Sequence, residues 1–275
     1  MNNVNNIFDL TGKVALITGA GGLLGPKHAE AIIEAGGSVI MTDHHLDRAL
    51  EKTNFLNKKY GKNKAVAYHM DVTDPKSVQS VVDLVEKIDI LINNAAKDPK
   101  VKKEEVLTPD SRFETMTSEY WNEGIDAALN GTFYCSQAVA NKMISQKIEG
   151  VILNISSDLG IIAPDQRLYR KPNTPEHLQN VKPITYSAAK WAIVGMTKYL
   201  GVYFAQKGIR VNCLSPTGVY NDHPEEFVKK LSNIIPMGRM ANIDEYKGAI
   251  IFLCSKASSY MTGENMVIDG GKTVW

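Results

Sequence analysis

Short apolar runs alternate with longer segments of helical spacing along nearly the whole chain. Runs of this length, rich in Val, Ile and Leu, are typical of strands that are buried on both faces. The alternation predicts an α/β fold with a doubly wound, mostly parallel sheet. The expected strands lie at Lys13 to Thr18, Ser38 to Thr42, Ala65 to Val72, Asp89 to Ala96, Val151 to Ser157, Ile209 to Ser215 and Met266 to Asp269.

Two long breaks interrupt this rhythm, at 97–117 and 159–185. Both follow the carboxyl end of an expected strand, and sheets of this kind bind their ligands at that edge. We therefore expect the functional site to lie near both breaks.

The chain has 275 residues, of which 44% are hydrophobic, and a formal net charge of +1. These values suit one α/β domain over 1–275. The charge gives no reason to expect nucleic acid or a membrane surface as a partner, and no apolar run is long enough to span a bilayer. The start of the chain lacks the basic and apolar regions of a signal peptide, so a cytoplasmic location is expected.

The three cysteines, Cys135, Cys213 and Cys254, are scattered through apolar segments. Their spacing matches neither a metal site nor a disulfide pattern, which predicts buried, reduced thiols. His44 and His45 lack the further ligands that a metal ion would need, so no metal is expected.

The first expected strand runs directly into Gly19-Ala-Gly-Gly-Leu-Leu-Gly25 and then into a helical segment from about Pro26 to Ala35. Glycines let the backbone turn tightly and approach a ligand closely, and the N–H groups at a helix start favour a pyrophosphate. This order of strand, glycine turn and helix predicts a dinucleotide-binding site.

An acidic residue, Asp43, ends the second expected strand. In dinucleotide folds an acid in this place accepts hydrogen bonds from the adenosine ribose and disfavours the 2′-phosphate of NADP. Asp43 therefore favours NAD. Two alternatives stay open, because Asp43 could cap the helix that begins near His45 and Arg48 could reach a phosphate.

Tyr186 and Lys190 are four residues apart in a helical segment, which puts their side chains on one face. A phenol is a poor base at neutral pH, whereas a nearby cation favours the phenolate and lowers the pKa of the phenol. The pair predicts an acid/base catalyst. Solvated helices often carry the same pair by chance, so this interpretation depends on the rest of the chain.

Taken together, these features resemble the short-chain dehydrogenase/reductase family in its compact single-domain form, from Leu10 to Gly271. The resemblance implies a Rossmann-fold enzyme that transfers hydride between a nicotinamide and a secondary alcohol or carbonyl. Besides the glycine turn and the Tyr186/Lys190 pair, the matching motifs are Asp71-Val72, Asn93-Asn-Ala95, Asn130-Gly-Thr-Phe133, Asn154-Ile-Ser-Ser157, Arg210-Val-Asn212 and Thr262-Gly-Glu-Asn-Met-Val-Ile-Asp-Gly-Gly271.

The resemblance implies catalytic roles for four residues. Tyr186 would exchange a proton with the substrate oxygen, while Lys190 would assist it and bind the nicotinamide ribose. Ser157 would hydrogen-bond the reacting oxygen, with Ser156 as the alternative, and Asn130 would hold a water in a proton relay.

The resemblance also implies cofactor contacts along several strand ends. Gly19, Gly22, Leu24 and Gly25 would surround the pyrophosphate. Asp43 would bind the adenosine ribose, Asp71 and Val72 would lie beside the adenine, Asn93 and Ala95 would lie along the central strand, and Pro216 and Val219 would approach the carboxamide. Asn93 could instead be structural, tying neighbouring strands together.

The chain departs from the family pattern in four places, of which Ala96, where glycine is usual after Asn-Asn-Ala, is a small change. Leu23 stands where compact members have glycine, which gives a spacing closer to nucleotide-sugar epimerases and dehydratases. Thr217 follows Pro216 where glycine is usual. Ser157 and Tyr186 are separated by an insertion over about 163–182, within the second break. The insertion's candidates to meet a substrate, if they are not simply solvated, are Arg167, Tyr169, Arg170, Lys171, His177 and Lys182.

The inserted loop and the glycine turn resemble those of bacterial members that modify flagellin or surface glycans, which implies a polar, sugar-like substrate. Two other functions stay open: an epimerase or dehydratase that recycles the hydride on a nucleotide sugar, and a non-catalytic NAD-binding sensor or scaffold.

Three further segments are predicted to form a lid, an interface between subunits and a packed tail. By resemblance, 220–235 is a lid over the substrate. The long helical segments at 117–145 and 185–206 fit the family's homotetramer or dimer, although burial under loops would give the same pattern. The tail Lys272-Thr-Val-Trp275 is expected to reach a neighbouring subunit or to pack on its own chain.

Overall fold

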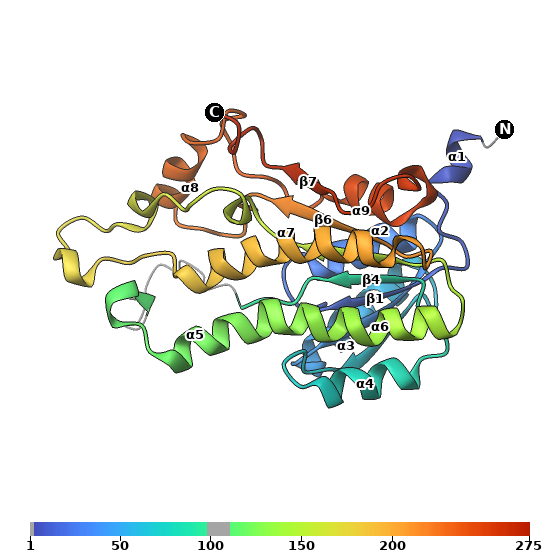
Figure 1. The fold of residues 1–275 in the computed structure, drawn as a ribbon. Coiled ribbons are helices and arrows are strands. Elements are labelled where there is room, and N and C mark those ends of the chain that lie inside the picture. Colours follow the sequence, from blue (N-terminus) through green and yellow to red (C-terminus); the bar gives the residue numbers. More distant parts are fainter. Residues whose placement is uncertain (1–2, 98–110) are drawn as a thin grey trace.

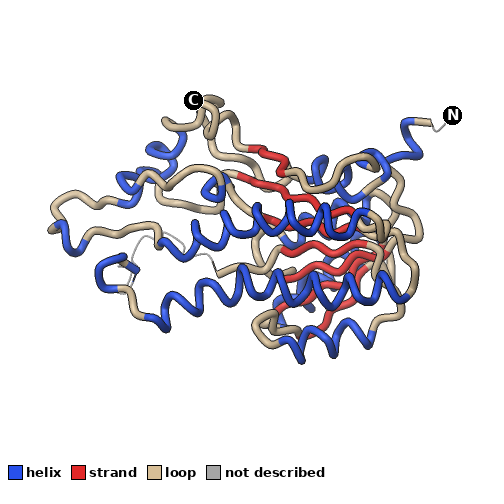
Figure 2. The backbone as a smooth tube through the Cα atoms, viewed as in Figure 1, coloured by secondary structure: helices blue, strands red, loops and turns tan. Residues whose placement is uncertain are grey.

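The computed structural model describes residues 3–97 and 111–275, so most of the first predicted break lies outside the described residues. Parallel strands form a sheet in the order β3-β2-β1-β4-β5-β6-β7 (Figures 1 and 2). The predicted fold class and all seven predicted strands are confirmed. The strands are β1 (Val14–Thr18), β2 (Ser38–Asp43), β3 (Ala65–His69), β4 (Ile90–Asn93), β5 (Val151–Ile155), β6 (Arg210–Pro216) and β7 (Asn265–Ile268).

Helices cover both faces of the sheet (Figure 1). One layer contains α2 (Gly25–Glu34), α3 (Leu46–Tyr60) and α9 (Lys247–Cys254), and the other contains α4 (Pro75–Leu84), α6 (Gly131–Ser145) and α7 (Ile184–Ala205). Successive strand residues alternate between two apolar cores, since Ala15 and Ile17 pack in the first layer's core and Leu16 packs in the second. The remaining α-helices of the described residues are α1 (Val4–Ile7), α5 (Ser118–Ile125) and α8 (Glu225–Ser232).

The long helical segment predicted at 117–145 contains a π-helical turn. Thr117 caps α5 by accepting a hydrogen bond from the backbone N–H of Tyr120. The π-helical turn Asp126–Asn130 joins α5 to α6. The backbone N–H of Gly131, the residue after the turn, donates to the carbonyl of Asp126. Such single-turn bulges occur often at functional sites.

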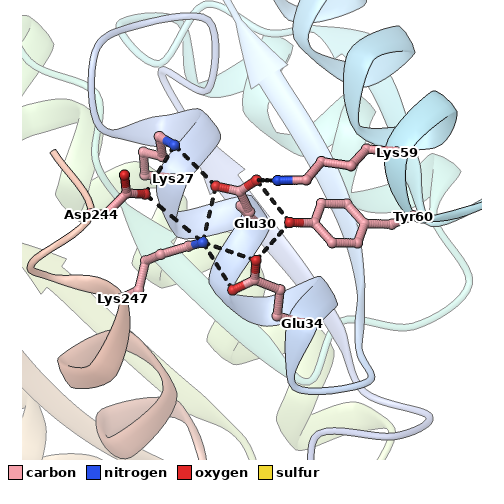
Figure 3. Close-up of polar contacts among 7 residues, drawn as sticks. All are labelled: Lys27, Glu30, Glu34, Lys59, Tyr60, Asp244 and Lys247. Carbon is pink, nitrogen blue, oxygen red and sulfur yellow. Dashed lines mark hydrogen bonds and ion pairs between the residues drawn. The ribbon is translucent and has the colours of Figure 1, made fainter.

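A cluster of ionic side chains joins the helices of the first layer (Figure 3). The side chain of Glu30 in α2 is 4% exposed, and its carboxylate contacts the ammonium groups of Lys27, Lys59 and Lys247 at 3.1, 2.7 and 3.0 Å. Tyr60 donates a hydrogen bond to the same carboxylate at 2.8 Å. Burial raises the pKa of Glu30, but these hydrogen bonds outweigh it and hold that pKa well below its usual range. Glu30 therefore ties α2 to the end of α3 and to α9.

Long loops project beyond the carboxyl ends of the strands (Figure 2). Short 3-10 turns at Gln166–Tyr169 and Glu176–Leu178 shape the predicted insertion. Its Leu168 packs with Leu231 of α8 and with Ile235 and Met240 in a small apolar cluster. The insertion and the segment predicted to be a lid thus pack against each other.

No helix in the described ranges is long and apolar enough to cross a membrane.

Candidate active site

A cavity of about 870 Å³ lies at the carboxyl ends of β1 to β6. Its wall includes Gly19 after β1, Asp43 at the end of β2, and Ser157 after β5. The strand order reverses between β1 and β4, because β2 and β3 lie on one side of β1 and the later strands lie on the other. Ligands of doubly wound sheets bind at such a switch point, so the cavity lies where the sequence predicts a site.

The glycine turn forms a close-packed wall at the switch point. A Cβ at Gly19 would lie 2.8 Å from Cα of Ala95, and one at Gly25 would lie 2.6 Å from Cα of Ala20. Gly19 also has a φ of 60°, which favours glycine. Leu24, the N-cap residue of α2, has no polar side chain to cap the helix, which fits the binding of a pyrophosphate there.

Asn94 holds this turn, a role that sequence reasoning did not assign to it. Its side-chain amide donates to the carbonyls of Thr18 and Gly19, both at 3.0 Å. Behind it, His28 is fully buried, and burial lowers its pKa to about 4 despite a hydrogen bond with Asn94. A neutral imidazole therefore backs the turn at physiological pH.

Asp43 is fixed by the backbone of two segments. Its carboxylate oxygens accept hydrogen bonds from the N–H of Gly21 and the N–H of His45, both at 2.9 Å. The N-cap of α3 is His45 rather than Asp43, so the helix-cap alternative is wrong. Asp43 lines the cavity together with Arg48, Asp71 and Val72.

Ser157, Tyr186 and Lys190 line the same cavity. Lys190 is buried; its ammonium donates to the carbonyl of Ile155 at 2.7 Å and lies 5.7 Å from the centre of the Tyr186 ring. A second ammonium, that of Lys182 in the insertion, lies over this ring at 4.1 Å. Two cations thus lie close to one phenol.

The two serines after β5 have different surroundings. Ser156 donates its hydroxyl to the backbone carbonyl of Lys190 at 2.9 Å. Ser157 donates to the carboxylate of Asp158 at 2.8 Å. Both serines line the cavity, and each donates its hydroxyl, Ser156 to the backbone of α7 and Ser157 to the residue that follows it.

Asp158, Thr217 and Lys272 form a buried polar cluster on the cavity wall that sequence reasoning missed. The second carboxylate oxygen of Asp158 accepts from the Thr217 hydroxyl and from the Lys272 ammonium, both at 2.7 Å. The only sequence signal was Thr217 in place of the usual glycine. Since Lys272 binds Asp158 and the Trp275 indole N–H reaches the carbonyl of Ile234 at 3.3 Å, the tail packs on its own chain.

Three predicted site residues are not among those that line the cavity: Gly25, Asn93 and Asn130. Asn93 donates to Ser136 and Asn154, both at 2.9 Å, which is the structural role left open from the sequence. Asn130 donates to Asp126 at 2.6 Å within the π-helical turn. The remaining predicted residues, Gly19, Gly22, Leu24, Asp43, Asp71, Val72, Ala95, Ser157, Tyr186, Lys190, Pro216 and Val219, all line the cavity.

The insertion contributes fewer of its candidates than the sequence suggested. Of its six polar candidates, Tyr169 and Lys182 line the cavity. Arg167 pairs with Asp165, and Arg170 pairs with Glu176. Within the described residues, no group of three His, Cys, Asp or Glu side chains could hold a metal ion.

A doubly wound sheet with a glycine turn at its switch point, and a lysine beside a tyrosine on the cavity wall, defines a dinucleotide-binding oxidoreductase. The comparisons with known proteins agree. The family model for short chain dehydrogenase matches residues 13–169, and the model described as Enoyl-(Acyl carrier protein) reductase matches residues 176–273. The chain belongs to the short-chain dehydrogenase/reductase family and is an oxidoreductase acting on CH–OH or carbonyl groups with NAD(P).

Relatives and solved structures match over almost the full chain. A sorbose reductase from Candida albicans is 34% identical, over 98% of this chain and 90% of its own. A gluconate 5-dehydrogenase from Burkholderia cenocepacia, solved with NADP and tartrate, is 27% identical with a TM-score of 0.84, covering 99% of this chain and 100% of its own. A short chain dehydrogenase from Leptospira borgpetersenii, solved with bound NAD+, is 32% identical with a TM-score of 0.82. The match covers 100% of this chain and 97% of that structure's chain.

Proposed function

We propose that the protein is an NAD-dependent dehydrogenase or reductase for a secondary alcohol or ketone on a small polyhydroxylated molecule, such as a sugar or polyol. The observation that carries the proposal is the position of Tyr186, which lines the cavity beside Lys190 and beneath Lys182. The polar surroundings of Ser157 and the names of the sugar-related relatives support a polyhydroxylated substrate. A role in flagellin or surface-glycan modification stays a prediction.

A nicotinamide held in this cavity would supply the hydride acceptor or donor for the reaction. During oxidation, Tyr186 takes the proton of the substrate hydroxyl as the C–H bond breaks and the carbonyl forms, and during reduction it returns that proton. Lys190 favours the phenolate by its charge. Ser157 hydrogen-bonds the reacting oxygen, and Asn130 holds a water that passes the proton onward.

Asp43 supports NAD as the preferred cofactor, because the carboxylate is already oriented by Gly21 and His45. An acid held there accepts the ribose hydroxyls and repels a 2′-phosphate. The cofactor residues are those predicted from the sequence that line the cavity, with Gly25 supporting the turn from behind.

The first test is binding of NAD, NADH, NADP and NADPH by calorimetry, followed by a screen of alcohols, sugars and nucleotide sugars for nicotinamide absorbance. We expect the wild type to turn over at least one of these substrates. The turnover rate of Tyr186→Phe should be lower by at least about 100-fold, since general acid/base catalysis contributes at least that factor. Tyr260→Phe, which also removes a phenol hydroxyl but at an exposed site outside the cavity wall, is the control. Tight NAD binding without turnover would favour the sensor, and isomerised product without net NADH would favour the epimerase.

A variant of Asp43 tests the preference for NAD over NADP. Asp43→Ala should lower the ratio of NAD to NADP affinity by about tenfold or more, because it removes both the ribose acceptor and the charge that repels the phosphate. An unchanged ratio would mean that Asp43 does not select the cofactor.

We also propose that the protein forms a homo-oligomer, a dimer or tetramer, through α7. Exposed apolar side chains lie on this helix at Trp191, Tyr199, Val202 and Tyr203. Several exposed apolar side chains on one helix often mark an interface. The free, buried thiols of Cys135, Cys213 and Cys254 suit a reducing compartment such as the cytoplasm.

A further inference from the structure

The hydroxyl of Ser157 is engaged by a neighbour that the family motifs do not include. Asp158 Oδ1 accepts from the Ser157 hydroxyl and from the backbone N–H of Leu159, both at 2.8 Å. Asp158 Oδ2 accepts from Thr217 and Lys272. Two donors on each oxygen fill the acceptor capacity of a carboxylate.

The ion pair of Asp158 fixes the direction of the hydrogen bond between Ser157 and Asp158. Asp158 Oδ2 forms a 2.7 Å ion pair with the ammonium of the buried Lys272, and a carboxylate in an ion pair can only accept hydrogen bonds. Ser157 must therefore donate its hydroxyl hydrogen bond to Asp158 in this arrangement. Its hydroxyl is not yet available as a donor to a substrate oxygen.

When a reacting oxygen binds Ser157, Asp158 must exchange one hydrogen-bond donor for another. When Ser157 turns its hydroxyl toward a substrate carbonyl, Asp158 Oδ1 loses one of its two donors. Asp158 is 3% exposed, and a buried carboxylate with an unfilled acceptor position is costly. A hydroxyl supplied by the substrate in the same place would restore the lost hydrogen bond.

The spacing of the two groups indicates which substrate can do this. Ser157 Oγ and Asp158 Oδ1 are a hydrogen-bond length apart. Oxygens on adjacent carbons of a gauche diol are separated by a similar length, so the reacting oxygen can meet Ser157 while its neighbour donates to Asp158. A lone alcohol or ketone cannot make the second bond.

We propose that Asp158, held by Lys272 and Thr217, binds a hydroxyl on the carbon next to the reacting one, and so selects vicinal diols and α-hydroxy ketones. The inference rests on the proposed function and names its substrate class. Asp158 is the specificity-determining residue, and Lys272 and Thr217 are positioning residues.

The test compares butane-2,3-diol with butan-2-ol, each as a mixture of stereoisomers, with NAD or NADP. The two alcohols share a carbon skeleton and a reacting group and differ in the neighbouring hydroxyl. The wild type should have a kcat/KM for the diol at least about tenfold above that for butan-2-ol, since one hydrogen bond to a charged group is worth at least this factor.

The double variant Asp158→Ala/Lys272→Met should bring this ratio close to one. Removing both charges together avoids leaving one buried and unpaired. Thr217→Val, which keeps the shape of the side chain, should lower the ratio by a smaller factor. The matched control is Asp89→Ala/Lys13→Met, which removes another ion pair with a buried carboxylate at the amino end of β1 and should leave the ratio unchanged.

The outcomes separate this inference from the proposed function. A wild-type ratio near one, or a high ratio that survives in the Asp158 double variant, would overturn the diol inference while the dehydrogenase activity stood. If either double variant failed to fold in a melting measurement, the wild-type and Thr217→Val ratios would still decide. No turnover of either alcohol or of any screened substrate, despite NAD binding, would overturn both.

Discussion

At the scale of single residues, Tyr186 has a second cation whose position the sequence could not give. Lys182 lies over its ring in the structure. A cation near a phenol favours the phenolate, which is the form that takes the substrate proton during oxidation. In Lys182→Met, the acid limb of the pH profile of kcat/KM for oxidation should therefore move to higher pH.

The control for this variant is Lys171→Met, in the same insertion but not on the cavity wall. Its profile should match that of the wild type. Identical shifts in the two variants would indicate a general effect of surface charge, and no shift in Lys182→Met would show that this cation does not act on the phenol.

Site residues that belong to local motifs could be predicted from the sequence, whereas those that depend on distant contacts could not. Tyr186 and Lys190 share a helix, and Gly19 follows its strand directly, so their spacing already brings them together. Asp158 and Lys272 meet across 114 positions of the chain. No local pattern encodes that contact, and a surface lysine and a buried one look alike in a sequence.

At the scale of elements, the cluster around Glu30 makes the helix layer sensitive to acid. Glu30→Gln should lower the free energy of unfolding by about 2 kcal/mol at pH 7, because hydrogen bonds to a buried charge are lost. The folded-state pKa of Glu30 lies below its ordinary value of 4.5. Its contribution is therefore complete above that value and is lost as the pH falls below it.

Chemical denaturation of both proteins at several pH values measures this effect. The difference between wild type and Glu30→Gln should be constant above about pH 5 and should shrink in more acidic solution. Glu34→Gln, whose carboxylate is more exposed, should cost less than about 1 kcal/mol. An equal difference at all pH values would mean that the loss in Glu30→Gln is one of packing rather than charge.

The elements themselves were largely predictable. Strands buried on both faces appear as continuous apolar runs, and Leu16 faces one core while Ile17 faces the other. The π-helical turn at Asp126–Asn130 was not predictable, because the residues there have ordinary helical composition and one extra residue per turn leaves no periodic signal.

At the scale of the whole molecule, the apolar face of α7 predicts association. Val202 is 79% exposed. The rings of Tyr199 and Tyr203 on the same helix stack on each other, with their centres 5.8 Å apart. Val202→Glu should weaken assembly by at least about tenfold, since the charge would be buried without a partner. Light scattering after size exclusion measures the mass. Tyr260→Glu, at a fully exposed site outside α7, should leave the mass unchanged, and a monomeric wild type would contradict the proposal.

The order of the sheet separates the residues proposed to bind the adenosine half of the cofactor from those proposed to act on the substrate. The strands β1 to β4 occupy one side and β5 to β7 the other, so each half of the chain builds one half of the sheet (Figure 1). The first half carries Gly19 and Asp43, and the second carries Ser157, Tyr186 and Lys272. Recombination between relatives at a crossover just before β5 should thus transmit coenzyme choice with the first parent and substrate choice with the second, which makes this chain a natural subject for chimeric enzymes.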